Sequence, residues 1–146
     1  MAFRGTFDHT LDAKNRLTIP AKFRAALSEG VVVSPQPDIT KCVAIWRPED
    51  YEAHTRRTLD SLPSHSPEAA SLRRFFYGNS FDTELDAAGR VMLPSFLLEH
   101  AGLDREVVIT GGGDYLEVWS RADWADYKAT LVNRTREMTA SIGQPA

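Results

Sequence analysis

The chain has 146 residues, of which 42% are hydrophobic, and this length and composition suit one compact domain with a buried core. It contains no run of about 18 or more apolar residues, and its N-terminal stretch lacks the apolar segment of a signal peptide, so we expect a cytoplasmic protein without a membrane span. The net charge is −3, from 17 Lys and Arg against 20 Asp and Glu, and bulk charge therefore does not indicate a nucleic-acid-binding protein.

The charges are unevenly distributed along the chain. The first 24 residues carry five basic side chains against two acidic ones, for a local charge of +3, so the remainder carries −6. Such an asymmetry is typical of a surface meant for an anionic partner, although a solvated face of mixed charge explains it equally well. The five basic residues are Arg4, Lys14, Arg16, Lys22 and Arg24.

The first half of the chain predicts strands and a short helix. Apolar and polar residues alternate on both sides of a polar centre in residues 7–19, so we expect a β-hairpin there. Pro20 ends the pairing and can open a short helix over 21–27. A second hairpin is expected over 31–46, with its turn at 35–38.

The second half repeats this order. "FDHTLDAKNRLTIP" (7–20) returns as "FDTELDAAGRVMLP" (81–94), with seven identities in fourteen positions at an offset of 74. The hairpin of residues 31–46 has a counterpart over 107–119, which turns at a glycine-rich stretch, 111–114. Two copies so far apart indicate a pseudo-dimer about an internal two-fold axis rather than a solenoid, which repeats every 20–50 residues or so and needs at least about three copies.

Helices are expected after each second hairpin and between the halves. Their start signals are Pro at the first helical position or a Ser N-cap, and they occur at Pro48, at Ser66 with Pro67, and at Ser120 with Asp123. We therefore predict two similar units joined by a helical connector and followed by a helix and tail. The predicted bounds are 6–54 and 80–127 for the units, 55–79 for the connector and 128–146 for the C-terminal part.

The repeated element contains a turn whose type can be predicted from its residues. A type I turn followed by a left-handed residue prefers Asp at its first position and Gly or Asn at its last. Residues 12–15 and 86–89 both fit, so we predict structural, turn-forming roles for Asp12, Asn15, Asp86 and Gly89. That template does not require Lys14 at the tip or Arg16 after the turn.

Two interpretations of the arginines remain open. Arg16 and Arg90 can be salt-bridge partners of the turn aspartates or of the other half, or they can belong to a basic edge that binds phosphates and guanine edges. The copies differ in charge, since the first copy has cations where the second has uncharged side chains: Lys14, Lys22 and Arg24 align with Ala88, Phe96 and Leu98. This difference favours a DNA-binding role for the first copy. The apolar stretch 95–103 suits either a packing surface between halves or subunits or simple core burial.

At this point the residues resemble a known family. "FRGTFDHTLDAKNRLTIPAKFR", "LDAAGRVMLPSFLLEHAGL" and the length are similar to the MraZ family of bacterial transcriptional regulators, which contain two SpoVT-AbrB-type domains. The resemblance covers nearly the whole chain, and the doubled Asp-x-x-x-Arg motif is highly specific. It implies an α+β fold centred on a β-barrel, in which swapped hairpins of the two halves form a pseudo-dimer with flanking helices.

The resemblance also implies a function and an assembly. Proteins like this form ring-shaped homo-oligomers, associate with the nucleoid and bind short direct repeats of double-stranded DNA in the promoter of the division and cell-wall gene cluster. By position, Asp12 and Arg16 form the first motif and Asp86 and Arg90 the second, and Arg4 and Lys14 belong to the DNA-facing edge. The chain departs from the family pattern at Asn15, where the first motif generally has Gly.

The sequence also allows comparison with two other classes of protein, an antitoxin and an enzyme. An antitoxin-like barrel that binds DNA and also a protein partner is the alternative, although the chain has no long acidic tail. An enzyme is not expected, because no metal-ligand cluster, nucleophile–base pair or nucleotide motif surrounds the four histidines, His9, His54, His65 and His100. We accordingly predict no metal, no cofactor and no small-molecule substrate.

Overall fold

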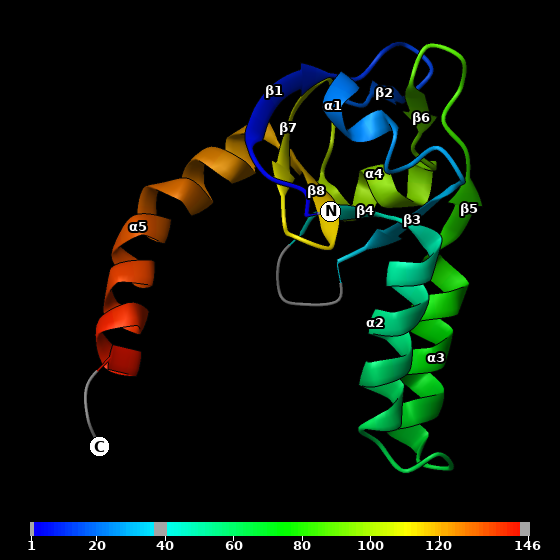
Figure 1. The fold of residues 1–146 in the computed structure, drawn as a ribbon, viewed down its shortest axis with the longest axis vertical. Coiled ribbons are helices and arrows are strands. Elements are labelled where there is room, and N and C mark those ends of the chain that lie inside the picture. Colours follow the sequence, from blue (N-terminus) through cyan, green and yellow to red (C-terminus); the bar gives the residue numbers. More distant parts are fainter. Residues whose placement is uncertain (1, 37–40, 144–146) are drawn as a thin grey trace.

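The structure is a computed structural model that describes residues 2–36 and 41–143. Its first half contains β1 (Thr6–Thr10), β2 (Arg16–Thr18), α1 (Ala21–Arg24), β3 (Val31–Pro35) and β4 (Val43–Trp46). Two helices connect the halves, α2 (Pro48–Asp60) and α3 (Pro67–Asn79). The second half contains β5 (Phe81–Thr83), β6 (Arg90–Met92), α4 (Ser95–Ala101), β7 (Glu106–Gly111), β8 (Tyr115–Ser120) and α5 (Arg121–Gly143) (Figure 1).

The two halves exchange their first strands. In the six-stranded antiparallel sheet the order is β1-β7-β8-β4-β3-β5, so β1 pairs with a strand of the second half and β5 with a strand of the first. β2 and β6 pair with each other in a separate two-stranded sheet, in which Leu17 lies opposite Val91. The swapped arrangement of the halves is thus present in the strand pairing.

The hairpin expected over residues 7–19 does not form as a continuous ladder. Leu11, which follows β1, forms an isolated bridge with Leu17 of β2, whereas each strand is paired along its length with the other half. The predictions for the second hairpins are confirmed, since β3 pairs with β4 and β7 with β8. The turn expected at 35–38 lies partly outside the described residues, which omit 37–40, and the end of the expected C-terminal tail, 144–146, also lies outside them.

The large sheet is open rather than closed into the expected barrel. In the part of the chain that the structure describes, β1 and β5 each have one neighbouring strand and form the two edges. β2 and β6 lie in their own sheet and are three-residue strands that are followed two residues later by Pro20 and Pro94. Because proline has no N–H to donate, pairing stops there.

One hydrophobic core serves both halves. Leu17 and Ile19 from the first copy and Val91 and Leu93 from the second are at most 1% exposed and belong to the same buried cluster as the centre of the large sheet. Burying such a side chain stabilises the fold by about 1.5–3 kcal/mol. The short helices α1 and α4 cover this core with Phe23 and with Leu97 and Ala101. The fold therefore depends on both copies at once.

The helices begin where the start signals predicted. Pro48 and Pro67 lie at the first turns of α2 and α3, and the Ser66 hydroxyl accepts a hydrogen bond of 3.1 Å from Ala69 N. At the start of α5, Ser120 Oγ accepts from Asp123 N at 3.0 Å. The α2–α3 hairpin and α5 both extend away from the strands, well separated from each other (Figure 1). None of the described helices is long and apolar enough to cross a membrane.

Candidate nucleic-acid interface

The first turn is organised by one carboxylate. Asp12 Oδ1 accepts hydrogen bonds from the backbone N–H groups of Lys14 and Arg16, both at 2.9 Å, and Asp12 Oδ2 accepts from Arg16 Nε at 2.7 Å. Asn15 has φ 59° and donates its N–H to Asp12 O at 3.0 Å, which closes the turn. The left-handed conformation is the one predicted for the last turn position, and asparagine tolerates it better than most residues.

The second turn has the same geometry. Asp86 Oδ1 accepts from the N–H groups of Ala88 and Arg90 at 2.9 Å, and Asp86 Oδ2 accepts from Arg90 Nε at 2.8 Å. Gly89 has φ 76° and donates to Asp86 O at 2.9 Å. In each copy, therefore, the salt bridge within the motif is real, and it also orients the guanidinium, because it occupies Nε.

Each turn is held by the strand of the other half. Ile19 N donates to Gly89 O at 2.9 Å, and Leu93 N donates to Asn15 O at 3.0 Å. Arg90 Nη1 also lies 3.9 Å from Asp12 Oδ2, so the charges of the two motifs meet. The two turns consequently lie side by side at one end of the molecule, beyond β2 and β6 (Figure 1).

Hydrogen bonding keeps both turn carboxylates ionised. The backbone N–H of Arg16, aided by its guanidinium, lowers the pKa of Asp12, and the backbone N–H and guanidinium of Arg90 do the same for the pKa of Asp86. Slight burial opposes both effects without reversing them. Above the ordinary pKa of a carboxyl group, each aspartate therefore remains a charged acceptor for its arginine.

The structure separates the predicted basic residues into two groups. Lys14 and Arg16 lie on the first turn and Arg90 after the second, and Arg24 reaches the second turn from α1. Lys22 lies elsewhere, with Nζ 4.7 Å from the centre of the Phe7 ring and 5.0 Å from that of Phe23.

Lys22 lies near Arg4, at some distance from the turns. A Cβ on Gly5 would come within 3.5 Å of Lys22 Nζ, so Lys22 lies at the start of β1 beside the exposed Arg4, whereas the first turn follows the other end of that strand. The basic edge predicted from the sequence is therefore not one continuous group.

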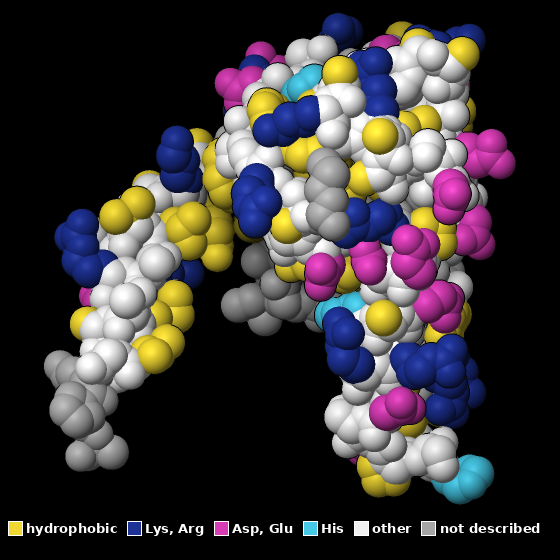
Figure 2. All heavy atoms as spheres, viewed as in Figure 1, with side chains coloured by type: hydrophobic (Ala, Val, Ile, Leu, Met, Phe, Trp, Pro, Cys, Tyr) yellow, Lys and Arg dark blue, Asp and Glu magenta, His cyan; other side chains and the backbone are white. Residues whose placement is uncertain are grey.

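The surface charge is distributed accordingly. Figure 2 shows Lys and Arg side chains over the body around α1 and also on the α2–α3 hairpin and α5. Asp and Glu side chains lie beside β5, at the start of α2 and near β1. The exposed acidic residues there include Asp82, Glu84 and Glu49. The face in this view therefore carries side chains of both charges.

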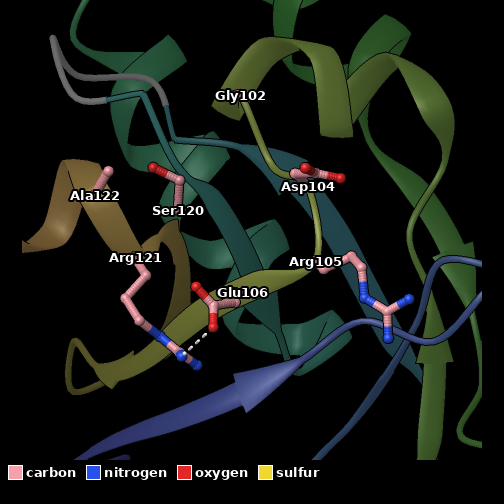
Figure 3. A pocket seen from close by; sticks show the side chains of 7 residues that line it. All are labelled: Gly102, Asp104, Arg105, Glu106, Ser120, Arg121 and Ala122. Atoms are coloured by element: carbon pink, nitrogen blue, oxygen red, sulfur yellow. Dashed lines mark ion pairs between the residues drawn. The ribbon is translucent and has the colours of Figure 1, made fainter.

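Sequence reasoning missed Arg121, which holds the start of α5. Its Nη2 donates to His9 O at 2.8 Å and Val107 O at 3.3 Å, and its Nη1 lies 3.1 Å from Glu106 Oε1 (Figure 3). Arg121 and Glu106 line a cavity of about 290 Å³ together with Asp104 and Arg105. Because the guanidinium is already paired within the chain, we assign Arg121 an anchoring role. No local sequence pattern predicts this role of Arg121, because its partner His9 is 112 positions away.

The described side chains contain no metal site. Among residues 2–36 and 41–143, no group of three or more His, Cys, Asp or Glu side chains could hold an ion. The chemistry that the two turns offer is instead that of exposed cations on a rigid frame. Arginine with Nε bound to a carboxylate can still present both terminal nitrogens to phosphate or to a guanine edge.

The fold and the paired turns define a class: an internally duplicated, strand-exchanged α+β protein that presents two Asp-x-x-x-Arg turns at one end. A family model described as "MraZ protein, putative antitoxin-like" matches residues 2–75 and again residues 76–141. The chain belongs to the MraZ family.

Relatives with curated descriptions agree with this assignment. The chain is 38% identical over 125 residues to "Transcriptional regulator MraZ" of Desulfitobacterium hafniense (strain Y51), an alignment that covers 86% of this chain and 85% of that protein. It is 36% identical over 140 residues to the protein of that name from Syntrophomonas wolfei, with 96% of each chain covered. A third such protein, from Marinomonas sp. (strain MWYL1), is 38% identical over 126 residues, which are 84% of this chain and 82% of that protein.

Proposed function

We propose that the chain is a DNA-binding regulator of transcription that recognises double-stranded DNA through its two Asp-x-x-x-Arg turns. The observation that carries this proposal is the arrangement of Arg16 and Arg90 beside each other, each held by its own aspartate through Nε. The names of the relatives, which describe regulators of transcription rather than enzymes, support it.

The residues differ in what they offer to DNA. Arg16 is 27% exposed at its side chain and fixed at Nε, which suits bidentate contact with the O6 and N7 atoms of guanine. Lys14 is exposed at the tip of the turn and suits a phosphate, because a flexible ammonium carries charge without a fixed orientation. Arg4 and Lys22, at the start of β1, would contact the backbone of the duplex at a distance from the turns.

We further propose that the protein binds short direct repeats, in the promoter of the division and cell-wall gene cluster, as a ring-shaped homo-oligomer associated with the nucleoid in the cytoplasm. A few cations on one subunit would give weak, salt-sensitive binding, since each neutralised phosphate adds about 0.9 to the slope of log affinity against log salt. Several subunits engaging repeated sites would raise the affinity by about 10² to 10⁴. Oligomerisation and repeated boxes would thus belong to one mechanism.

The helix α5 supports the proposal of an oligomer. Within the described chain it has no buried residue, yet Leu131, Met138 and Ile142 recur on one helical face that continues the packing of Trp124 and Tyr127 on Trp119. Met138 is 57% and Ile142 85% exposed. An apolar face of this length is stabilised when another surface covers it, and a second copy of the chain is the occupant that the proposed ring supplies.

The division into units at 6–54, 55–79, 80–127 and 128–146 remains part of this proposal. In it, the two similar units present DNA-contacting turns. The connector contains the end of α2 and all of α3, and the C-terminal part contains most of α5, which begins within the second unit.

The deciding experiment is a footprint on the DNA upstream of the chain's own gene, run beside a mass measurement of the protein alone and bound. We expect protection of regularly spaced repeats and a complex that contains several subunits. Electrophoretic shifts with intact and scrambled repeats at several salt concentrations provide the control. Equal affinity for the intact and the scrambled repeats at every salt concentration would refute the proposal that the protein is a sequence-specific regulator.

An antitoxin-like protein is a second candidate function, and the exposed apolar face of α5 is the observation that favours it. In that role, the face would bind a different protein while the turns still bind DNA. Three acidic residues of α5 stand against four basic ones, which does not favour masking of a basic toxin: Asp123, Asp126 and Glu137 against Arg121, Lys128, Arg134 and Arg136. Purified protein of uniform oligomeric mass with α5 protected from proteolysis would support the ring over this alternative.

A further inference from the structure

The two turns share a backbone but differ in how they are covered. Asn15 is exposed at the end of the first turn, whereas Gly89, in the same left-handed position of the second, is buried. Both positions tolerate Asn or Gly by their φ angles, 59° and 76°. Turn geometry alone therefore does not explain why one is covered.

The cover is the side chain of Arg24, which comes from α1 of the first half. Arg24 Nε donates to Ile19 O at 2.9 Å, and Ile19 N in turn donates to Gly89 O at 2.9 Å, so the guanidinium is fixed directly over the second turn. A Cβ on Gly89 would meet Arg24 Cδ at 2.6 Å and Cζ at 2.7 Å, and would meet Nε as well. Glycine at position 89 thus makes room for Arg24.

The equivalent position in the first turn has no such cation. Arg24 aligns with Leu98 at the offset of 74, so the residue of α4 that corresponds to it is apolar. Conversely, the first turn has Lys14 at its tip where the second has Ala88. Each turn therefore has one arginine of its own motif and one additional cation, and the additional cation of the second turn belongs to the first half of the chain.

We propose that Arg24 and Arg90 form a composite second DNA contact, in which Arg24 supplies to the second turn the phosphate-binding charge that Lys14 supplies to the first. The inference rests on the proposed function and extends it to the second motif. With Nε occupied by Ile19 O, the terminal nitrogens of Arg24 are the atoms left to bind a phosphate. Arg24 and Asp86 both line a cavity of about 310 Å³ beside the second turn. The charge of Asp86 is bound there by Arg90 and two backbone N–H groups.

The test is a salt titration of DNA affinity for three variants of the full chain. Arg24→Leu places the residue of position 98 at position 24, and should lower the affinity for intact repeats and reduce the salt slope by about 0.9 for each Arg24 that contacts a phosphate. Arg24→Lys keeps the charge without the Nε bond and should retain most of the slope. The matched control is Arg74→Leu on α3, an exposed arginine of the hairpin, which should change neither quantity.

A double-mutant cycle then asks whether Gly89 acts through Arg24. Gly89→Asn copies the first turn and, because its side chain displaces Arg24, should weaken binding in the otherwise unchanged chain. In the Arg24→Leu background the same substitution should cause little further loss. Melting temperatures and oligomer masses of all variants identify any that are misfolded, and Arg24→Lys keeps the test decisive if Arg24→Leu is one of them.

The outcomes separate this inference from the proposed function. If Arg24→Leu behaves like Arg74→Leu, or if Gly89→Asn costs as much in the Arg24→Leu background as in the otherwise unchanged chain, the composite contact is wrong. The proposed function stands in that case, provided that Arg16→Ala still abolishes the preference for intact repeats. If the unchanged protein itself binds intact and scrambled repeats equally, both the composite contact and the proposed function are wrong.

Discussion

Replacing Arg16 by alanine separates the two roles that its geometry permits. Arg16 both pairs with Asp12 and carries free terminal nitrogens, so stability and DNA recognition must be measured on the same variant. We expect Arg16→Ala to lose specific binding while the oligomer and the melting temperature stay nearly unchanged.

The expected stability change is small because most of the turn survives. Asp12 keeps its bonds from the backbone N–H groups of residues 14 and 16, which alanine retains. Only the Nε contact is lost, and it joins side chains that are 27% and 34% exposed, where water screens the pair. The melting temperature should therefore change by no more than about 4 °C.

The expected loss in DNA recognition is much larger. A bidentate arginine–guanine contact provides about 1–3 kcal/mol of discrimination, which is a factor of about 5 to 160 in affinity for one site. When one oligomer engages two repeats, the loss multiplies to roughly 30-fold or more. The loss should appear with intact repeats and much less with scrambled DNA.

Fluorescence anisotropy with both DNAs, beside thermal unfolding, measures these quantities. Two variants sharpen the result: Arg16→Lys should keep affinity for scrambled DNA but lose the preference, whereas Lys14→Ala should weaken binding to both and lower the salt slope. Two results together would contradict the DNA-binding role of Arg16: a fall of more than about 10 °C in the melting temperature of Arg16→Ala, and a normal preference for intact repeats in the variant that remains folded. Arg16 would then be a structural salt-bridge residue.

Four further changes have definite expected outcomes. Asn15→Gly should preserve DNA affinity and change the urea midpoint little, since it removes left-handed strain but loosens the unfolded chain; a collapse in affinity would show that the Asn15 amide touches DNA. The lowered pKa values of Asp12 and Asp86 predict a contribution to stability that is present above about pH 4 and is lost as the pH falls through the pKa values of the folded state. In the double variant Asp12→Asn, Asp86→Asn, the urea midpoint should therefore fall less steeply at acid pH than in the unchanged chain. An unchanged profile of urea midpoint against pH would contradict this. Ser66→Ala should lower the free energy of unfolding by about 1 kcal/mol, measured by urea titration, because Ala69 N loses its acceptor; no loss would mean that the cap contributes nothing. Met138→Asp should reduce the mass of the oligomer in light scattering while Asn133→Asp, on the opposite face of α5, should not, and equal masses would remove α5 from the proposed interface.

Local patterns predicted the elements whose partners lie nearby in sequence. The hairpins β3–β4 and β7–β8, the N-caps of α3 and α5 and both Asp turns depend on residues only a few positions apart, and all are present. The helix expected over 21–27 is shorter, with α1 ending at Arg24. Periodicity also placed strands around the first turn correctly. It cannot specify which strand pairs with which, because an alternating pattern fixes only the buried face.

The geometry of the two turns was predictable from the sequence, whereas the arrangement of the side chains around them was not. The template of the turn identified Asp12, Asn15, Asp86 and Gly89, since each role is local. The crossing of Arg24 onto Gly89 joins positions 65 apart, and it depends on the exchange of strands rather than on any motif. Likewise, the cation–ring contacts of Lys22 remove it from the turns although it lies only eight positions from Lys14. Charge in a sequence window was therefore a poor guide to charge in a surface patch.

Because the halves are interleaved, the end of the molecule that carries the two turns depends on both copies. A first half alone would leave β1 without β7 and β2 without β6, and would expose Leu17 and Ile19, which are fully buried in the whole chain. It would also remove the Leu93 N–H that holds Asn15 O. Each turn keeps the hydrogen bonds of its own motif but loses a support from the other copy. An internal duplication of this kind joins the two turns in one folding unit. If the turns bind DNA as proposed, substitutions in one half are expected to change the DNA contact made by the other half.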